Sequence, residues 1–247
     1  MSSRISELAA SIAQRSRIKN PNSDTVRENG EKSAQIIAAE IERFFGSSPD
    51  IAILDFGAAA GRVTTPLANL LPRARVTATD VDAEAIEYLQ LTAPPNCTAQ
   101  VNAYVPPLPA EIGQFDCIFA ISVWSHFAED LSMEWLKEMR RIAKPGALLL
   151  ISTQGIASLR RLKRNNPRWA KVGIEQFLRD KYIFSDYQKL AAESAKWPGI
   201  ESGGSWGITV MHPEYIEEKW GALFEVVEVR ERGTAAIQDL VILRNTR

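Results

Sequence analysis

The chain has 247 residues, of which 45% are hydrophobic and 24% charged, and its formal net charge at pH 7 is −1. A chain of this length and composition can bury a substantial core, and we expect a single large domain. A net charge so close to zero provides no global field for nucleic acid or an anionic membrane, so nucleic acid is not an expected partner.

Cysteine usage and hydropathy exclude further classes. Neither Cys97 nor Cys117 has a CxxC partner or a histidine at ligand spacing, so we expect no bound metal and no disulfide framework. No window approaches the roughly 18 apolar residues that a membrane span needs, and the first twenty residues lack the apolar stretch of a signal peptide. These features predict a cytoplasmic protein without a membrane span, and they leave the oligomeric state open.

Residues 1–153 alternate between helical and strand patterns. The first thirty residues are polar and partly helical, and residues 30–46 carry an apolar stripe that ends at Gly46. Because parallel strands need crossover helices, the alternation that follows predicts an α/β fold with a doubly wound sheet. The predicted strands are 51–56, 74–80, 97–103, 115–122 and 147–153, and the predicted helices are 62–71, 83–91 and 131–143.

The pattern changes after Thr153. Residues 155–215 mix helical pieces with turn-rich sequence, which makes them a candidate lid that covers the substrate. Strands 223–231 and 237–245 follow, and their short link favours an antiparallel hairpin at the sheet edge. We therefore predict one domain, 1–247, that consists of a helical segment (1–46), a ligand-binding core (47–153), a variable segment (155–215) and final strands (216–247).

Residues 54–63, LDFGAAAGRV, occupy the first strand-to-helix turn, where parallel sheets bind ligands. Gly57 permits a tight turn, and Gly61 lets the next helix begin close to a ligand. A nicotinamide-binding G-x-G-x-x-G would need glycine at positions 59 and 62, where this chain has Ala59 and Arg62. A nicotinamide-dependent oxidoreductase is therefore a weaker alternative.

Asp80 ends the second strand about 20 residues after this loop, where an acidic side chain accepts hydrogen bonds from ribose hydroxyls. Together with Asp55, it favours a ligand that contains a ribose and a cationic amino-acid part. A small-residue turn followed by a solvated aspartate is the structural alternative.

Several motifs in this order resemble the class I S-adenosylmethionine-dependent methyltransferases. They are ILDFGAAAGRV, TATDVD, VNAYVPPLP, FDCIFAISVWSHF and LKEMRRIAKPGALLLIS, and the resemblance covers roughly residues 29–153 and, more weakly, the final hairpin. The likeness is greatest to bacterial members that act on small molecules or glycans. It implies a Rossmann-like, seven-stranded sheet that is mostly parallel with an antiparallel C-terminal hairpin strand, and S-adenosyl-L-methionine as the cofactor.

The resemblance also implies roles for individual residues. Asp55 would border the methionine part of the donor, Asp80 would hold the ribose, and Val81 would pack on the adenine. Asn102 stands where the family often has an aspartate near the adenine amino group, and its amide oxygen can accept that hydrogen bond. The complete set of expected cofactor-binding residues is Asp55, Gly57, Ala58, Gly61, Asp80, Val81, Asn102, Ala103 and Ile121.

Methyl transfer from a sulfonium is an in-line displacement that needs no metal, but a hydroxyl acceptor usually needs a general base. His126 follows the fourth strand and is the candidate base for O-methylation of a small-molecule or glycan hydroxyl. Glu129 and Asp130 are close enough in sequence to orient its ring. Packing against the cofactor is the alternative role for His126, and a non-catalytic S-adenosylmethionine-binding module is the alternative for the chain.

Candidate acceptor contacts are the aromatic residues Trp124, Trp206 and Tyr215, with His212 as a weaker candidate. Core packing is the alternative for these aromatics. The basic run 160–171 could contact a phosphate-bearing acceptor or a membrane surface, or it could be a solvated helix face. The signature [DN]-P-P-[FY], which is typical of methyltransferases that act on nucleic-acid bases, is absent from YVPPLP.

Overall fold

The computed structural model describes residues 2–14, 23–111, 113–165, 169, 172–186, 205–235 and 237–246. Its helices are α1 (Ser2–Ala13), α2 (Asp24–Phe45), α3 (Thr64–Leu70), α4 (Ala83–Thr92), α5 (Glu129–Ile142), α6 (Ile156–Asn165), α8 (Ile174–Asp180), α9 (Pro213–Tyr215) and the π-helical η3 (Ile216–Trp220). Its strands are β1 (Ala52–Phe56), β2 (Arg75–Asp80), β3 (Cys97–Val101), β4 (Phe115–Ala120), β5 (Ala143–Thr153), β6 (Tyr182–Asp186), β7 (Gly207–Met211), β8 (Glu225–Arg230) and β9 (Asp239–Arg244).

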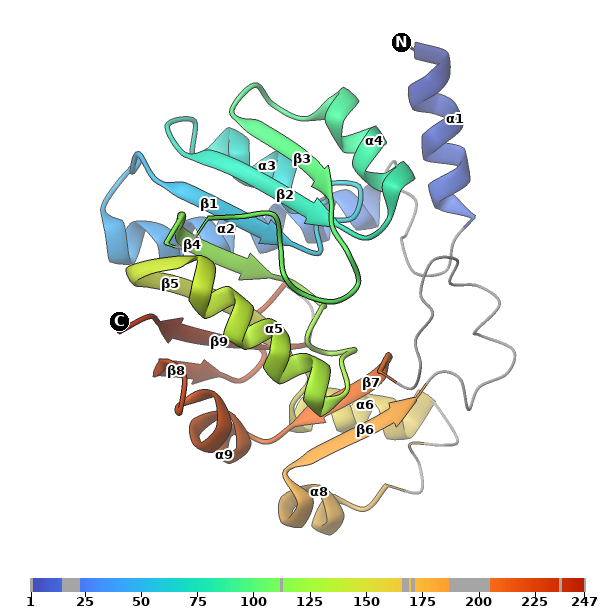
Figure 1. The fold of residues 1–247 in the computed structure, drawn as a ribbon. Helices are drawn as coiled ribbons and strands as arrows, with labels where there is room; N and C mark the ends of the chain where they lie inside the picture. Colours follow the sequence, from blue (N-terminus) through green and yellow to red (C-terminus); the bar gives the residue numbers. More distant parts are fainter. Residues whose placement is uncertain are drawn as a thin grey trace.

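Seven strands form one sheet in the order β3-β2-β1-β4-β5-β9-β8 (Figure 1). The strands from β3 to β5 pair in parallel, whereas β9 pairs antiparallel with both β5 and β8. The predicted α/β fold and the predicted hairpin at the sheet edge are confirmed. In the described part of the chain, no helix is long and apolar enough to cross a membrane.

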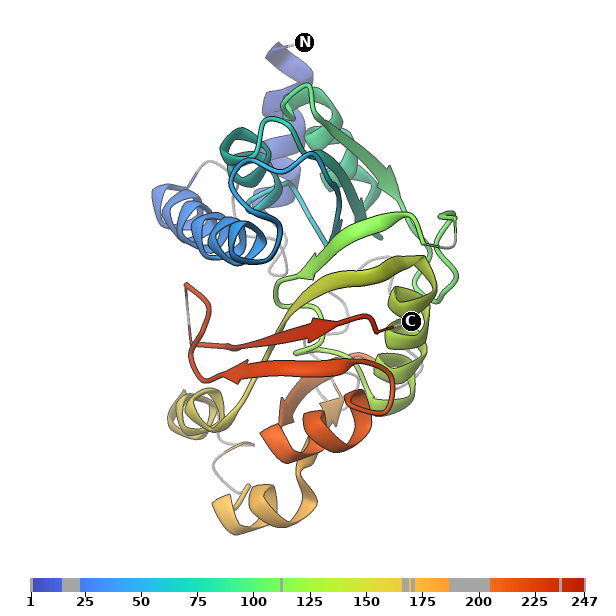
Figure 2. The ribbon, with the colours of Figure 1, turned by 90° about the vertical axis from the view of Figure 1, so that its left-hand side faces the viewer.

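Helices cover both faces of the sheet, with α2 on one side and α5 on the other (Figure 2). Strand β5 shows why both faces need covering, because its side chains alternate between two apolar clusters. Leu148 and Leu150 pack in the cluster that includes α2 and α3, and Leu149 and Ile151 pack in the cluster that includes α5 and η3. The centre of the sheet is therefore buried on both faces.

Two boundaries differ from the sequence prediction. Helix α2 begins at Asp24 and contains Gly30, which the sequence analysis took as its start. A Cβ at Gly30 would overlap the carbonyl oxygen of Arg62, so this glycine allows α2 to lie directly on the loop after β1. Strand β5 begins at Ala143 and includes residues 144–146, which were predicted to be a turn between helix and strand.

The segment 155–215 is more ordered than the sequence analysis expected, within its described residues. It contains α6, α8 and the two-stranded antiparallel sheet β6-β7, which lie together below the main sheet in Figure 1. Leu159, Trp169, Phe177 and Val210 form its own small core. Both strands are five residues long, too short for a clear periodicity.

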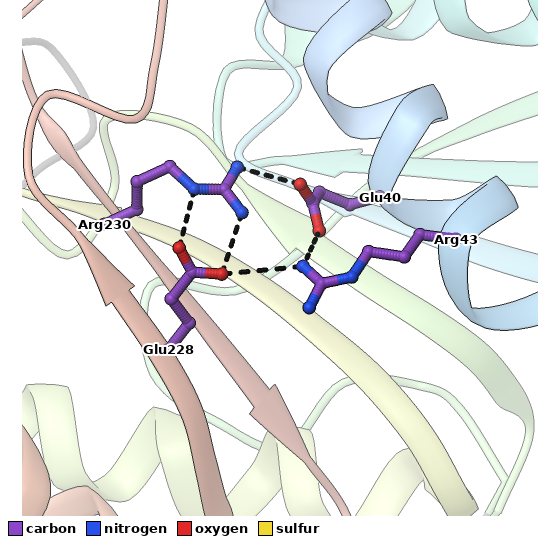
Figure 3. A network of polar contacts seen from close by, with 4 residues as sticks. All are labelled: Glu40, Arg43, Glu228 and Arg230. Atoms are coloured by element: carbon purple, nitrogen blue, oxygen red, sulfur yellow. Dashed lines mark hydrogen bonds and ion pairs between the residues drawn. The ribbon is translucent and has the colours of Figure 1, made fainter.

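A network of four charged side chains fixes α2 to the edge strand β8 (Figure 3). Glu40 accepts a hydrogen bond from Arg230 Nη1 at 2.8 Å and another from Arg43 Nη1 at 3.1 Å. Arg230 Nε and Nη2 also donate to the two carboxylate oxygens of Glu228, each at 2.8 Å, and Arg43 Nη1 lies 3.5 Å from Glu228. The C-terminal end of α2 is thus attached to the final hairpin.

Candidate functional site

A cavity of about 750 Å³ opens at the carboxyl ends of β1, β2 and β4. Its walls come from the loop after β1, the segment after β4, the amino-terminal half of α2 and the turn before β9. Of the predicted cofactor-binding residues, all except Ala103 line it, and so do His126 and Trp206. The sequence therefore located the cavity correctly, although the role of each residue stays a prediction.

The loop after β1 adopts a left-handed backbone at three positions, with φ of +83° at Gly57, +49° at Ala59 and +80° at Gly61. The amides of Gly57 and Ala58 both donate to the carbonyl oxygen of Thr79, at 2.8 and 2.9 Å. These bonds fold the loop across the end of β2. At Ala59 the left-handed conformation costs about 1 kcal/mol, because its Cβ is crowded there.

Asp80 holds this loop from the end of β2. Its Oδ2 accepts a hydrogen bond from the amide of Ala59 at 2.8 Å, and its Oδ1 accepts one from the amide of Asp82 at 2.9 Å. The first bond stabilises the unusual conformation of Ala59. Because a carboxylate offers about four lone-pair sites, the same oxygens can still accept the ribose hydroxyls that the sequence predicts.

Asp55 is buried at the end of β1, where its Oδ2 accepts a hydrogen bond from the Thr64 hydroxyl at 2.6 Å. Burial raises the pKa of Asp55 to about 7, and Thr64 and the positive charge of Arg62 oppose this shift. A cationic ligand in the cavity would favour the ionised carboxylate. This suits the predicted position of Asp55 beside the amino group of a bound methionine part.

Asn102 contributes a buried amide to the cavity wall. Its Nδ2 donates to the carbonyl oxygen of Ala103 at 2.6 Å, which fixes the orientation of the amide. Its Oδ1 has no hydrogen-bond partner among the described residues. A buried acceptor of this kind fits the adenine amino group, whereas Ala103 is exposed and contributes only its carbonyl oxygen to this arrangement.

His126 lies in the segment after β4, and its Nδ1 is 2.8 Å from the carbonyl oxygen of Gly207 in β7. Because a carbonyl oxygen can only accept, Nδ1 donates in this contact, and in the neutral ring Nε2 is then the nitrogen with the lone pair. The ring stacks on Trp206 with a centroid distance of 5.1 Å and an interplanar angle of 21°. The expected orienting role of Glu129 is corrected, since Glu129 accepts a hydrogen bond from the Tyr215 hydroxyl at 2.9 Å.

The expected aromatic wall is only partly present. All three aromatic residues belong to the main core, with Trp124 completely buried, Tyr215 5% exposed and Trp206 6% exposed, but only Trp206 also lines the cavity. The core-packing alternative therefore describes Trp124 and Tyr215. His212 does not line the cavity either: it caps α9, where its Nδ1 accepts a hydrogen bond from the amide of Glu214.

A polar cluster that carries no signal in the sequence also borders the cavity. Gln238, which precedes β9, accepts hydrogen bonds at its Oε1 from the hydroxyls of Ser122 at 2.9 Å and Ser152 at 2.8 Å. The Ser152 hydroxyl in turn accepts the amide of Ser122 at 2.7 Å, and Ser122 has a φ of +64°. Both Ser122 and Gln238 line the cavity. No local sequence pattern marks this cluster, because its members come from three separate strand ends.

The basic run 160–171 is placed only in part. Arg160, Arg161 and Arg164 are exposed on α6, and Lys163 Nζ donates to the carbonyl oxygen of Val172. None of these four residues lines the cavity. Arg168 and Lys171 lie outside the described residues.

Comparison with known proteins gives the class of this site. Residues 54–149 match the family model described as a methyltransferase domain. Among solved structures, the fold is similar to the N-methyltransferase NodS from Bradyrhizobium japonicum WM9 in complex with S-adenosyl-L-homocysteine, at 14% identity and a TM-score of 0.57 over 99% of this chain and 100% of that chain. It is also similar to magnesium protoporphyrin IX methyltransferase from Synechocystis PCC 6803, at 12% identity and 0.58 over 96% and 93%.

A third similar structure comes from the complex between the Haloferax volcanii Trm112 methyltransferase activator and a methyltransferase, at 13% identity and a TM-score of 0.59 over 98% of both chains. Residues 54–149 are thus a methyltransferase domain, in a chain with the fold of the class I S-adenosylmethionine-dependent methyltransferases. The predicted methyltransferase class is confirmed for residues 54–149.

Proposed function

We propose that the chain transfers the methyl group of S-adenosylmethionine to a hydroxyl oxygen of a small molecule or glycan, with His126 as the general base. The observation that carries this proposal is the contact between His126 Nδ1 and the Gly207 carbonyl oxygen, 2.8 Å apart, in the wall of the donor cavity. In the neutral ring, Nε2 is then the nitrogen that could take a proton.

The cavity residues fit the donor from end to end. Asp55 provides a carboxylate for the amino group, Asp80 provides oxygens for the ribose, and Asn102 Oδ1 provides a buried acceptor for the adenine. When bound, the donor supplies an electrophilic methyl group on a sulfonium. The residues of the chain hold the reacting atoms in line and accept the proton of the hydroxyl.

The other wall of the cavity suits a neutral, oxygen-rich acceptor. Trp206 provides an aromatic surface beside His126, and Gln238 provides an amide whose oxygen is already used by two serine hydroxyls. The Gln238 amide nitrogen is then the donor that an acceptor oxygen would meet. The charged lining residues Asp55 and Asp80 lie instead at the carboxyl ends of β1 and β2.

The proposal is tested by methyl transfer from radiolabelled S-adenosylmethionine to a panel of phenols and sugars. The kcat of His126→Gln should fall about 100-fold or more, and the remaining rate should rise with hydroxide concentration. His212→Gln, which changes the second histidine outside the cavity, should keep kcat within about twofold. If His126→Ala kept kcat within about threefold of the unmodified protein across the pH range, His126 would not be the base.

A further inference from the structure

The basic run 160–171 is a feature of the sequence that the donor cavity does not use. It contains six arginines and lysines and no acidic residue, in a chain whose formal net charge is −1. The remaining residues therefore carry a formal charge of −7 together. Such a local excess of positive charge on an otherwise acidic chain attracts anions to this segment.

Helix α6 carries the first four of these cations and holds three of them on one side. Arg160, Arg161 and Arg164 are exposed. Because Arg164 follows the other two by four and three positions, the three guanidiniums are neighbours on the helix surface. On the opposite side, Leu159 is completely buried in the small core of the segment. The helix therefore presents three arginines to solvent from a fixed position.

The chain itself does not neutralise these three arginines. Within the described residues, none of them forms a hydrogen bond or an ion pair. Other exposed arginines do form ion pairs with acidic side chains: Arg4 with Glu87, Arg27 with Asp24 and Arg75 with Asp50. The charge on the exposed side of α6 is thus available to an anionic partner.

A membrane surface suits α6 better than the other anionic partners. None of the three arginines lines the donor cavity, so they do not reach the phosphate of an acceptor placed there. Single-stranded nucleic acids stack their bases on exposed aromatic rings, but Trp169, the aromatic residue of the run, is only 2% exposed. Helix α8, at the same end of the molecule as α6 in Figures 1 and 2, instead exposes Leu178 by 53%. An exposed leucine is a side chain that can enter the headgroup region of a bilayer.

We propose that α6 binds the surface of an anionic phospholipid bilayer through Arg160, Arg161 and Arg164. Each guanidinium can pair with a phosphate or carboxylate of a lipid headgroup. Cations near such a surface each add to the attraction, and salt screens it, so the attachment is peripheral and reversible. The inference does not depend on the proposed function, because this surface lies outside the donor cavity.

Co-sedimentation of the full chain with lipid vesicles tests the inference. Vesicles of phosphatidylcholine with about 30% phosphatidylserine are compared with vesicles of phosphatidylcholine alone, at about 0.05 and 0.5 M NaCl. One variant combines Arg160→Gln, Arg161→Gln and Arg164→Gln, which removes three charges and keeps good helix formers. The matched control removes three charges at exposed positions elsewhere, by Arg73→Gln, Arg75→Gln and Arg244→Gln.

The unmodified chain should bind the mixed vesicles at low salt, lose at least about tenfold of its partition coefficient at high salt, and bind the neutral vesicles weakly. The α6 variant should lower the partition coefficient about 100-fold, which corresponds to about 1 kcal/mol for each cation removed. The control should stay within about threefold. Circular dichroism checks that both variants are folded, and the salt dependence of the unmodified chain needs no variant.

Three results would overturn the inference. The first is equal binding by the two triple variants, and the second is a failure of the unmodified chain to prefer the mixed vesicles. The third is tighter binding of an RNA oligonucleotide than of the mixed vesicles through the same three arginines, because the partner would then be a nucleic acid.

Discussion

The donor side and the acceptor side of the cavity are assembled in different ways. The donor side comes from consecutive strand ends between Asp55 and Asn102, and its main contacts join residues about 20 positions apart, as Ala59 and Asp80 do with a separation of 21. The acceptor side joins distant segments, since His126 and Gly207 are 81 residues apart and Ser122 and Gln238 are 116 apart. Under the proposed function, donor binding would therefore be a property of the core, and acceptor chemistry would depend on segments attached to it.

This difference has a functional consequence. Changes on the donor side should alter the affinity for S-adenosylhomocysteine, and changes in the segment 205–211 should alter turnover with the donor affinity preserved. The amide of Gly207 donates to the carbonyl oxygen of His126 at 2.8 Å, and the amide of Thr209 donates to that of Ser125 at 2.9 Å. These backbone hydrogen bonds hold the segment that carries the candidate base in position. The following substitutions separate the two sides.

Gly30→Ala should give the largest effect, on the donor side. Its Cβ would overlap the Arg62 carbonyl oxygen, so α2 must move away from the loop. We expect the Kd of S-adenosylhomocysteine to rise about 30-fold, although alanine favours helices by about 1 kcal/mol over glycine. Gly173→Ala is the control, because the nearest heavy atom would be 3.7 Å from its Cβ. Equal affinities for the two variants would show that α2 does not position the donor site.

Gly207→Ala should give the next largest effect, on the acceptor side. Its Cβ would overlap the Ser185 carbonyl oxygen, so β7 must shift and the contact with His126 Nδ1 must lengthen. We expect kcat to fall about 20-fold while the Kd of S-adenosylhomocysteine stays within about twofold. A parallel loss of donor affinity would mean that the two sides are not separable.

The pH dependence of donor binding should be somewhat smaller. Asp55 has a pKa of about 7 and is protonated below it, so its attraction for the donor's ammonium group is lost as the pH falls. We expect the Kd of S-adenosylhomocysteine to decrease about tenfold from pH 6 to pH 8. Asp55→Asn should bind more weakly at pH 8 and show no such change, and a flat profile for the unmodified protein would place the amino group elsewhere.

Ala59→Gly should give the smallest effect and sharpen the comparison. Glycine adopts the φ of +49° at this position without the Cβ penalty. Relief of this strain should raise the free energy of unfolding by about 1 kcal/mol. The greater entropy of glycine in the unfolded chain offsets part of that gain. Denaturant titration measures this, with Ala93→Gly as the control at a residue of extended φ, −69°. A destabilised Ala59→Gly variant would contradict the argument from backbone strain.

The sequence located the strand ends that line this side of the cavity because their signals are local. A strand, a glycine-containing turn and an acidic residue at the end of the next strand fall within about 30 residues, and the apolar runs of β1, β4 and β5 are unambiguous. The start of α2 was misplaced because Gly30 resembles a helix boundary, and only the packing on Arg62 explains a glycine inside a helix. That packing joins residues that no periodicity connects.

The acceptor side was predicted less well for the same physical reason. His126 and Trp206 were identified by residue type, but their contact requires β7 to pair with the segment after β4. Gln238 carries no signal in its own neighbourhood, since a polar residue before a strand is common. Trp124 and Tyr215 are aromatic residues near the site in sequence, and burial in the core places their rings away from the cavity.

The network of Figure 3 has an electrostatic consequence. Two carboxylates, on Glu40 and Glu228, alternate with two guanidiniums, on Arg43 and Arg230, so the formal charges around the ring sum to zero. The potential of such an alternating, neutral arrangement decays faster with distance than that of a single ion. The anchor of α2 therefore adds little field to the cavity, and the potential there is set by the charged residues of the cavity wall itself.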